Sequence, residues 1–184
     1  MNAHILERMI ERLEQVVAGP RRRLAFGVSA ALAECVTERD WLTRDPLAAG
    51  QEQYVRHILY ADAAGRYTIV AIVWRPGQRS SVHAHYTWSG AAVYRGELTE
   101  TIYRVSRGPA PPFPVSNIRR RPGDFTFHWP LNEIHRVGNE SAETAISIHV
   151  YGVGCEWLAT GVNRFIGPAS ASREDARRTA EVKK

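Results

Sequence analysis

The most informative stretch of the sequence is Gly77-Gln78-Arg79-Ser80-Ser81-Val82-His83-Ala84-His85. It ends in a His-X-His pair, and side chains two residues apart on a β-strand point to the same face. Both imidazoles can therefore reach a single point without distortion of the backbone. A pair of strand histidines is often incidental, so its meaning depends on the segments around it. We predict a strand over Val82–His85 that carries two candidate metal ligands, His83 and His85.

A second segment downstream repeats the pattern of glycine, histidine and asparagine. Gly123 is followed by Pro130-Leu131-Asn132-Glu133-Ile134-His135, and three residues separate this histidine from Asn139. Together the two segments resemble the paired motifs of the cupin superfamily. The first of those motifs is glycine, five residues and His-X-His, and the second is Pro-X-Gly-X-X-His-X-X-X-Asn after a glycine. Asn132 stands where the second motif usually has glycine. The resemblance implies a cupin (jelly-roll) β-barrel.

The cupin pattern usually has a glutamate between its His-X-His pair and the next glycine, here Gly96. No carboxylate lies between His85 and Gly96, and counting back from Gly96 puts Ser89 at the acidic position. The resemblance therefore implies a metal site of three neutral histidines, His83, His85 and His135. Three neutral imidazoles leave a divalent cation with its full charge, which attracts an anionic thiolate.

The rest of the chain predicts a mainly β fold with a helical segment in front. Apolar residues recur at three- and four-residue steps from Ile5 to Val17, which predicts an amphipathic helix that ends at Gly19-Pro20. A second helix is predicted over 24–35, and Asp45-Pro46 predicts the start of a short third helix. The four prolines within 109–114 predict a loop. Strands are predicted at 54–61, 67–74, 82–85, 90–94, 98–105, 117–121, 125–129, 134–137 and 145–151.

A strand near the end of the predicted barrel narrows the resemblance. Ser147-Ile148-His149-Val150-Tyr151 puts serine, histidine and tyrosine on one strand face, and Tyr54-Val55-Arg56 precedes the first predicted hairpin. With the three histidines in the same order, these residues are similar to the cysteine dioxygenase family of thiol dioxygenases, over residues 54–151. The resemblance implies a cytosolic cupin enzyme that uses Fe(II) and O₂ to oxidise a small thiol to a sulfinate.

The resemblance also implies roles for individual residues. Tyr151 donates a hydrogen bond to O₂ or to the substrate, His149 holds the tyrosine hydroxyl, and Ser147 holds the histidine. Arg56 is the candidate carboxylate clamp, because its planar guanidinium can bind a carboxylate through two hydrogen bonds. Arg164 is a candidate second contact for an anion.

One feature of the animal enzymes is missing from this sequence. Those enzymes carry a cysteine crosslinked to the tyrosine, whereas this chain has Ser89 or Gly90 at that place, depending on the motif from which one counts. Neither residue offers a sulfur atom, so we expect an unmodified Tyr151, as in the bacterial branch of the family. That branch includes enzymes for cysteine, 3-mercaptopropionate and other mercapto acids. Arg56 favours cysteine-type recognition, because members selective for 3-mercaptopropionate often have glutamine there.

Composition and charge bear on the remaining classes. The chain has 184 residues, 44% of them hydrophobic, which suits one globular domain and is too short for a TIM barrel. The net charge is +5, but the arginine triplets at 21–23 and 119–121 are dispersed, so we expect no nucleic-acid partner. Cys35 and Cys155 form neither a disulfide framework nor a four-thiolate zinc site. The start of the sequence lacks a signal-peptide pattern. We therefore expect a cytoplasmic protein without a membrane partner, either a monomer or a small homo-oligomer.

The leading hypothesis is one domain made of three parts: a helical cap over 1–50, a cupin barrel over 51–168 and a polar tail over 169–184. Its function is that of a non-haem Fe(II) thiol dioxygenase, with cysteine, 3-mercaptopropionate or mercaptosuccinate as possible substrates. A substrate with two carboxylates would suit a site that also contains Arg164. Two alternatives stay open: a non-catalytic cupin that binds a small anion or sugar, and a cupin isomerase with another metal. The Ser147, His149 and Tyr151 pattern favours an enzyme, because a binding barrel does not need it.

Overall fold

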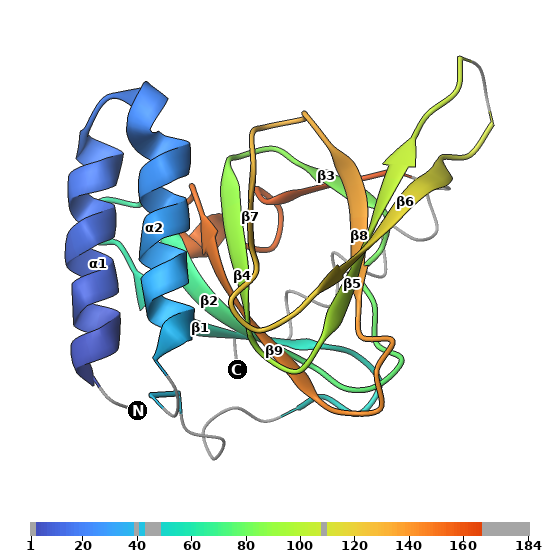
Figure 1. The fold of residues 1–184 in the computed structure, drawn as a ribbon. Coiled ribbons are helices and arrows are strands. Elements are labelled where there is room, and N and C mark those ends of the chain that lie inside the picture. Colours follow the sequence, from blue (N-terminus) through green and yellow to red (C-terminus); the bar gives the residue numbers. More distant parts are fainter. Residues whose placement is uncertain (1–2, 39–40, 43–48, 108–109, 167–184) are drawn as a thin grey trace.

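The computed structural model describes residues 3–38, 41–42, 49–107 and 110–166 of the chain. Two helices lie side by side against one flank of a β-barrel (Figure 1). The helical elements are α1 (Ala3–Ala18), the 3-10 turn η1 (Arg21–Arg23), α2 (Leu24–Thr37) and the 3-10 turn η2 (Cys155–Trp157). The strands are β1 (Val55–Ala61), β2 (Thr68–Trp74), β3 (His83–His85), β4 (Ser89–Arg95), β5 (Leu98–Arg104), β6 (Phe113–Arg120), β7 (Phe125–His128), β8 (Ile134–Gly138), β9 (Ala145–Tyr151) and β10 (Asn163–Phe165).

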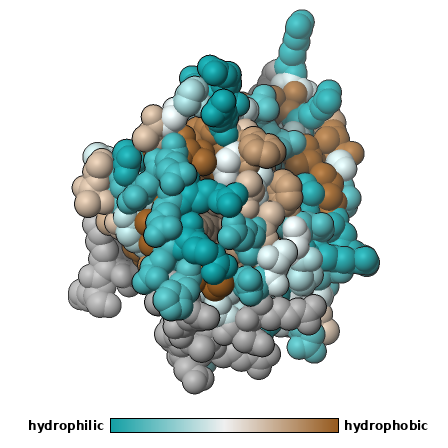
Figure 2. Space-filling view, turned by 60° about the vertical axis from the view of Figure 1, so that its left-hand side comes forward, coloured by the Kyte–Doolittle hydropathy of each residue, from teal (hydrophilic) through white to brown (hydrophobic). Residues whose placement is uncertain are grey.

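Helix α1 is amphipathic, as its sequence pattern predicts. Leu6, Met9 and Leu13 are buried, while the charged residues between them are exposed. Figure 2 turns the helix side of the molecule forward, and hydrophilic side chains dominate this face while hydrophobic ones form separate patches. The helix ends immediately before Gly19-Pro20, so this boundary is confirmed. No helix among the described residues is long and apolar enough to cross a membrane.

Helix α2 packs directly on β4, and a glycine makes the close contact possible. A Cβ atom added at Gly90 would lie 2.6 Å from Val28 Cγ1 and 2.8 Å from Leu32 Cδ1. Only a residue without a side chain allows the helix to approach this closely. Because successive strand residues alternate between faces, the neighbours Ser89 and Ala91 line the barrel interior.

Two five-stranded antiparallel sheets form the barrel. The sheet that the helices cover has the order β1-β2-β9-β4-β7, and the second sheet has the order β10-β3-β8-β5-β6. We call them the helix-covered sheet and the open sheet. Strands distant in sequence lie side by side in both sheets, which is the arrangement of a double-stranded β-helix. The predicted mainly β cupin fold with N-terminal helices is therefore confirmed.

The central strands of the helix-covered sheet are buried on both faces. Along β9, Ile148 and Val150 belong to the core beneath the helices, whereas His149 and Tyr151 line the barrel interior. A polar strand face can be buried in this way only if its polar groups find partners. The fold therefore needs a hydrogen-bonded cluster inside the barrel, and residues of β9 take part in it.

The structure departs from the sequence prediction at two strands. Phe113 and Pro114 belong to β6, although the proline-rich stretch 109–114 was expected to be a loop. The open sheet ends at β6, and proline is tolerated on an edge strand because one side of that strand needs no ladder hydrogen bond. The three-residue strand β10 was not predicted, because a strand this short has no recognisable periodicity. The predicted helix at Asp45-Pro46 and the predicted tail lie outside the described residues.

Candidate functional site

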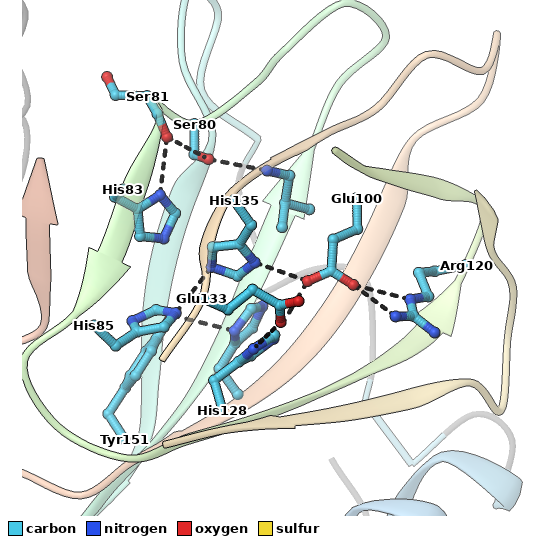
Figure 3. Close-up of polar contacts among 12 residues, drawn as sticks. Ser80, Ser81, His83, His85, Glu100, Arg120, His128, Glu133, His135 and Tyr151 are labelled. Atoms are coloured by element: carbon cyan, nitrogen blue, oxygen red, sulfur yellow. Dashed lines mark hydrogen bonds and ion pairs between the residues drawn. The ribbon is translucent and has the colours of Figure 1, made fainter. Parts of the chain in front are cut away.

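Three histidines from two adjacent strands converge inside the barrel. His83 and His85 lie on β3, and His135 lies on β8 directly across from His83 in the antiparallel register. All three are buried, and one ligand atom of each lies within 4.8 Å of the others. The Nε2 atoms of His85 and His135 are 3.0 Å apart (Figure 3). The structure thus brings together the three residues that the sequence predicted as metal ligands.

Two of these histidines have their tautomer set by a partner outside the cluster. His83 Nδ1 donates to the carbonyl oxygen of Ser81 at 2.8 Å, and His135 Nδ1 donates to Glu100 Oε1 at 2.7 Å. Each ring therefore keeps a lone pair on Nε2. Burial lowers the pKa of His83 and of His85 well below the usual range, which keeps both rings neutral. Neutral, converging imidazole nitrogens are the donor set that a divalent transition metal prefers.

Glu100, on β5, is a functional residue that the sequence analysis missed. It is 3% exposed, and its Oε2 accepts hydrogen bonds from Arg120 Nη2 at 2.7 Å and Nε at 3.0 Å. Its Oε1 lies 3.3 Å from His128 Nε2 as well as accepting from His135. Burial alone would raise the pKa of Glu100, but the contacts with His128 and His135 outweigh burial and hold that pKa well below its usual range. The carboxylate is therefore ionised and fixes the ring of His135.

His128, on β7, continues this network toward the surface. Its Nδ1 lies 2.8 Å from Glu133 Oε2, and the Glu133 side chain is 37% exposed. Burial would lower the pKa of His128, but the contacts with Glu100 and Glu133 outweigh burial and raise it to about 9. Glu100, His128 and His135 also lie close enough to hold an ion. His128 is already engaged between the carboxylates of Glu100 and Glu133, so the three-histidine cluster is the candidate metal position.

A neutral chain of hydrogen bonds runs along β9, in the middle of the helix-covered sheet. Trp74 Nε1 donates to Ser147 Oγ at 2.9 Å, and Ser147 Oγ lies 2.8 Å from His149 Nε2. The next distance, from His149 Nδ1 to the Tyr151 hydroxyl, is 3.1 Å. When Ser147 donates to Nε2, Nδ1–H donates to the tyrosine oxygen and leaves the tyrosine O–H for the cavity. We call Ser147, His149 and Tyr151 the relay.

Burial keeps the relay uncharged. It lowers the pKa of His149 to about 3, with a further contribution from the positive charge of Arg56. Burial likewise raises the pKa of Tyr151 to about 12, so the phenol keeps its proton. When Ser147 donates to His149, the relay therefore presents a neutral hydrogen-bond donor to the cavity.

Of the two predicted anion contacts, the structure brings one to the cavity. Arg56, on β1, lines the cavity, and its Nη2 lies 3.4 Å from the Tyr54 hydroxyl while its guanidinium lies 5.5 Å from the centre of the Tyr54 ring. Arg164 does not line the cavity. It is exposed and is in register with Ala84, on the face of β10 opposite to the histidines. Strand alternation points Arg164 away from the histidines in this structure, so its predicted contact with an anion stays a prediction.

The register of β4 and β9 decides between the two residues at the position of the animal crosslink. Ser89 lies directly opposite Tyr151 and lines the cavity. Gly90 faces α2 on the other side of the sheet. Ser89 is therefore the residue that faces the tyrosine.

A cavity of about 60 Å³ lies between these groups. Arg56, His85 and Tyr151 all line it, as do the apolar side chains of Ile72 and Val93. A space of this size holds a few water molecules or a small organic acid and excludes a polymer. The cavity thus combines a metal position, a cation and a neutral hydrogen-bond donor within reach of one small molecule.

Other predicted or conspicuous side chains lie away from the metal position. Trp88 lines a separate depression between the helices and the barrel. Cys35 is buried, and burial raises its pKa to about 12, so it is an unreactive thiol. In the triplet at 119–121, Arg119 and Arg121 both contact Glu97, while Arg120 contacts Glu100.

Comparison with known proteins identifies the family of this chain. A model of the family described as Cysteine dioxygenase type I matches residues 37–156. Similar solved structures include an uncharacterized conserved protein with a double-stranded β-helix domain from Klebsiella pneumoniae (TM-score 0.48, 17% identity, 71% of this chain and 100% of that chain). Another is a cupin superfamily protein from Desulfitobacterium hafniense (TM-score 0.47, 14% identity, 63% of this chain and 93% of that chain). Because the family match spans more than half of the sequence and includes all three histidines and the relay, this protein belongs to the cysteine dioxygenase type I family.

Proposed function

We propose that this protein is a non-haem Fe(II) thiol dioxygenase that oxidises a small mercapto-carboxylate to its sulfinate. The observation that carries the proposal is the buried three-histidine cluster in one small cavity with Arg56 and the relay. The overall reaction is R–SH + O₂ → R–SO₂H, in which both oxygen atoms enter the product and sulfur is oxidised by four electrons. We propose the thiol substrate and O₂ as the partners of this protein, and the cytoplasm as its location.

The residues divide the work of this reaction between them. His83, His85 and His135 would hold the iron, and Fe(II) when bound supplies the redox chemistry between thiolate sulfur and O₂. Arg56 binds the carboxylate and so limits rotation of the substrate about its sulfur. Tyr151 donates a hydrogen bond toward the reacting groups, and the relay keeps that phenol oriented and protonated. The buried cavity limits competing reactions with water.

The arginines support a substrate with a single carboxylate. Arg56 lines the cavity, whereas Arg164 faces outward. Arg120 also lines the cavity, but its two hydrogen bonds to Glu100 engage it within the protein. Cysteine and 3-mercaptopropionate therefore fit this cavity better than mercaptosuccinate.

Tyr151 is proposed to be free of a thioether crosslink, because Ser89 lies opposite it and offers no sulfur. The intact mass of the purified protein should then equal that of the unmodified chain. A loss of two hydrogens confined to the peptide that contains Tyr151 would contradict this proposal.

Oxygen uptake by the iron-loaded protein tests the function. Cysteine, 3-mercaptopropionate and mercaptosuccinate are supplied in turn, and the product is identified by mass spectrometry. We expect one O₂ consumed per sulfinate formed with at least one of the first two thiols, and little uptake with cysteamine, which has no carboxylate. A protein with one tightly bound iron per chain and no uptake with any of these thiols would overturn the proposal and favour a binding cupin.

A further inference from the structure

The short strand β10 brings a side chain to the cavity that the metal cluster and the relay do not use. Strand β10 pairs with β3 in the register Asn163↔His85 and Arg164↔Ala84. Because cross-strand partners share a face of the sheet, Asn163 points to the same side as His85. It lines the same cavity as His85 and Arg56.

The side-chain oxygen of Asn163 is buried, and it has no hydrogen-bond partner among the described residues. A buried carbonyl oxygen without a partner is unfavourable, so such atoms in native proteins usually have a donor supplied from elsewhere. Several polar groups that line the cavity are bonded to one another and not to this oxygen. Glu100 accepts from Arg120 and His135, and the relay residues bond to one another.

We propose that Asn163 is a specificity-determining residue whose side-chain oxygen accepts a hydrogen bond from the molecule bound in the cavity. A thiol-carboxylate that carries an amine or hydroxyl group on the carbon next to its carboxylate supplies that donor, whereas the unsubstituted analogue leaves the oxygen unpaired. Arg56, on the helix-covered sheet, binds the carboxylate. Asn163 contacts the substrate from the open sheet, beside His85. The identity of this molecule as a thiol-carboxylate rests on the proposed function.

The test compares two probes that differ only at the donor group. L-Cysteine has an ammonium group where 3-mercaptopropionate has a hydrogen, so common effects on the carboxylate and thiol cancel in the ratio of their kcat/KM values. We expect Asn163→Leu, which keeps the side-chain size and removes the acceptor, to lower the cysteine to 3-mercaptopropionate ratio by about 10- to 100-fold. Asn163→Asp keeps an acceptor oxygen in place and should retain or raise that ratio.

Arg164→Gln serves as the matched control, since Arg164 is the next residue of β10 and faces outward. It should leave the ratio within twofold of the wild-type value. Melting curves establish that each variant is folded. If Asn163→Leu does not fold, Asn163→Ala repeats the comparison with a smaller side chain that has no acceptor. The proposal is overturned if the folded variant without an acceptor keeps a ratio within twofold of the wild-type value. It is also overturned if Asn163→Asp lowers the ratio as much as Asn163→Leu does.

A second readout separates this inference from the proposed function. The zinc-loaded protein cannot perform redox chemistry, so calorimetry on it reports the affinity for both probes without turnover. Asn163-dependent discrimination in binding, without oxygen uptake by the iron-loaded protein, would reject the dioxygenase and retain the role of Asn163. Oxygen uptake with a ratio that Asn163→Leu does not change would retain the dioxygenase and reject the role of Asn163.

Discussion

Two networks inside the barrel, one around Glu100 and one along β9, accommodate buried polar side chains in different ways. On the side of His135 the network is charged: Glu100 and Glu133 are anionic, and Arg120 and His128 are cationic. On β9 the relay is neutral, because burial keeps His149 unprotonated and Tyr151 protonated. The charged network stands behind His135, whereas the neutral relay faces the cavity.

This difference follows from what each network has to hold. A cation is best held by rings whose tautomer is fixed by a strong partner, and an ionised carboxylate is the strongest acceptor available. Opposite charges within the network compensate one another, which makes burial tolerable. In the proposed function, a fixed positive charge beside the substrate would compete with Arg56 for the carboxylate, and a fixed negative charge would pair with Arg56 itself. A neutral relay can orient a proton there without adding a charge.

Loss of a metal ligand should have the largest effect. We expect wild-type protein to bind about one iron per chain and His135→Ala to lose most of it, because two histidines cannot complete the cluster. Iron content by elemental analysis checks this, with Arg164→Gln as the control that keeps its iron. Full iron occupancy in His135→Ala would show that this residue is not a metal ligand. The contrast between the charged network and the relay would then lose its explanation.

Arg56→Gln should have the next largest effect, on catalysis and not on metal content. Glutamine keeps a hydrogen-bond donor but loses the charge and the paired geometry, so kcat/KM for the best thiol-carboxylate should fall by roughly 10- to 1000-fold. Turnover of cysteamine should be nearly unchanged, since it has no carboxylate. Wild-type kcat/KM for every carboxylated thiol would show that another residue binds the carboxylate.

The variants Glu100→Gln and Ser147→Ala compare the charged network and the relay directly. The first variant removes the charge behind His135 and should weaken Fe(II) affinity by about 10- to 100-fold in anaerobic titration of the metal-free protein. The second breaks the relay and should leave that affinity within about twofold, while lowering kcat. Equal metal affinities in the two variants would mean that the charged network does not support the metal ligand.

Replacing a carboxylate that lies outside both networks should have the smallest effect and serves as a reference for the other variants. Asp62 pairs with Arg66 at 2.7 Å, and this hydrogen bond lowers the pKa of Asp62 from 3.8 to about 2. Because the pKa is lower in the folded state, the contact stabilises the protein above pH 3.8, and the stabilisation is lost as the pH falls toward 2. Asp62→Asn should lower the Tm by about 2–4 °C at pH 7. A difference that does not shrink on acidification would be inconsistent with this ionisation.

Sequence periodicity and motifs predicted much of the fold. The helix stripe from Ile5 to Val17 and the alternation of β9 are local patterns, and the structure has both elements. The spacing of His83 and His85 likewise fixed a common face, since strand geometry has a period of two. Family resemblance then joined His135 to this pair, and the register of β3 and β8 places it there.

The remaining site residues depend on contacts between distant segments. Glu100 lies 35 positions before His135, and nothing in the sequence distinguishes it from other glutamates on strands. It contacts the ring of His135 because β5 pairs with β8. Asn163 and Arg164 are adjacent, and nothing local tells which of them faces inward. The sequence determined the ligand types and their strands, because those follow from local spacing. Only the tertiary structure decided which polar neighbours support them, because register and strand order are set by long-range packing.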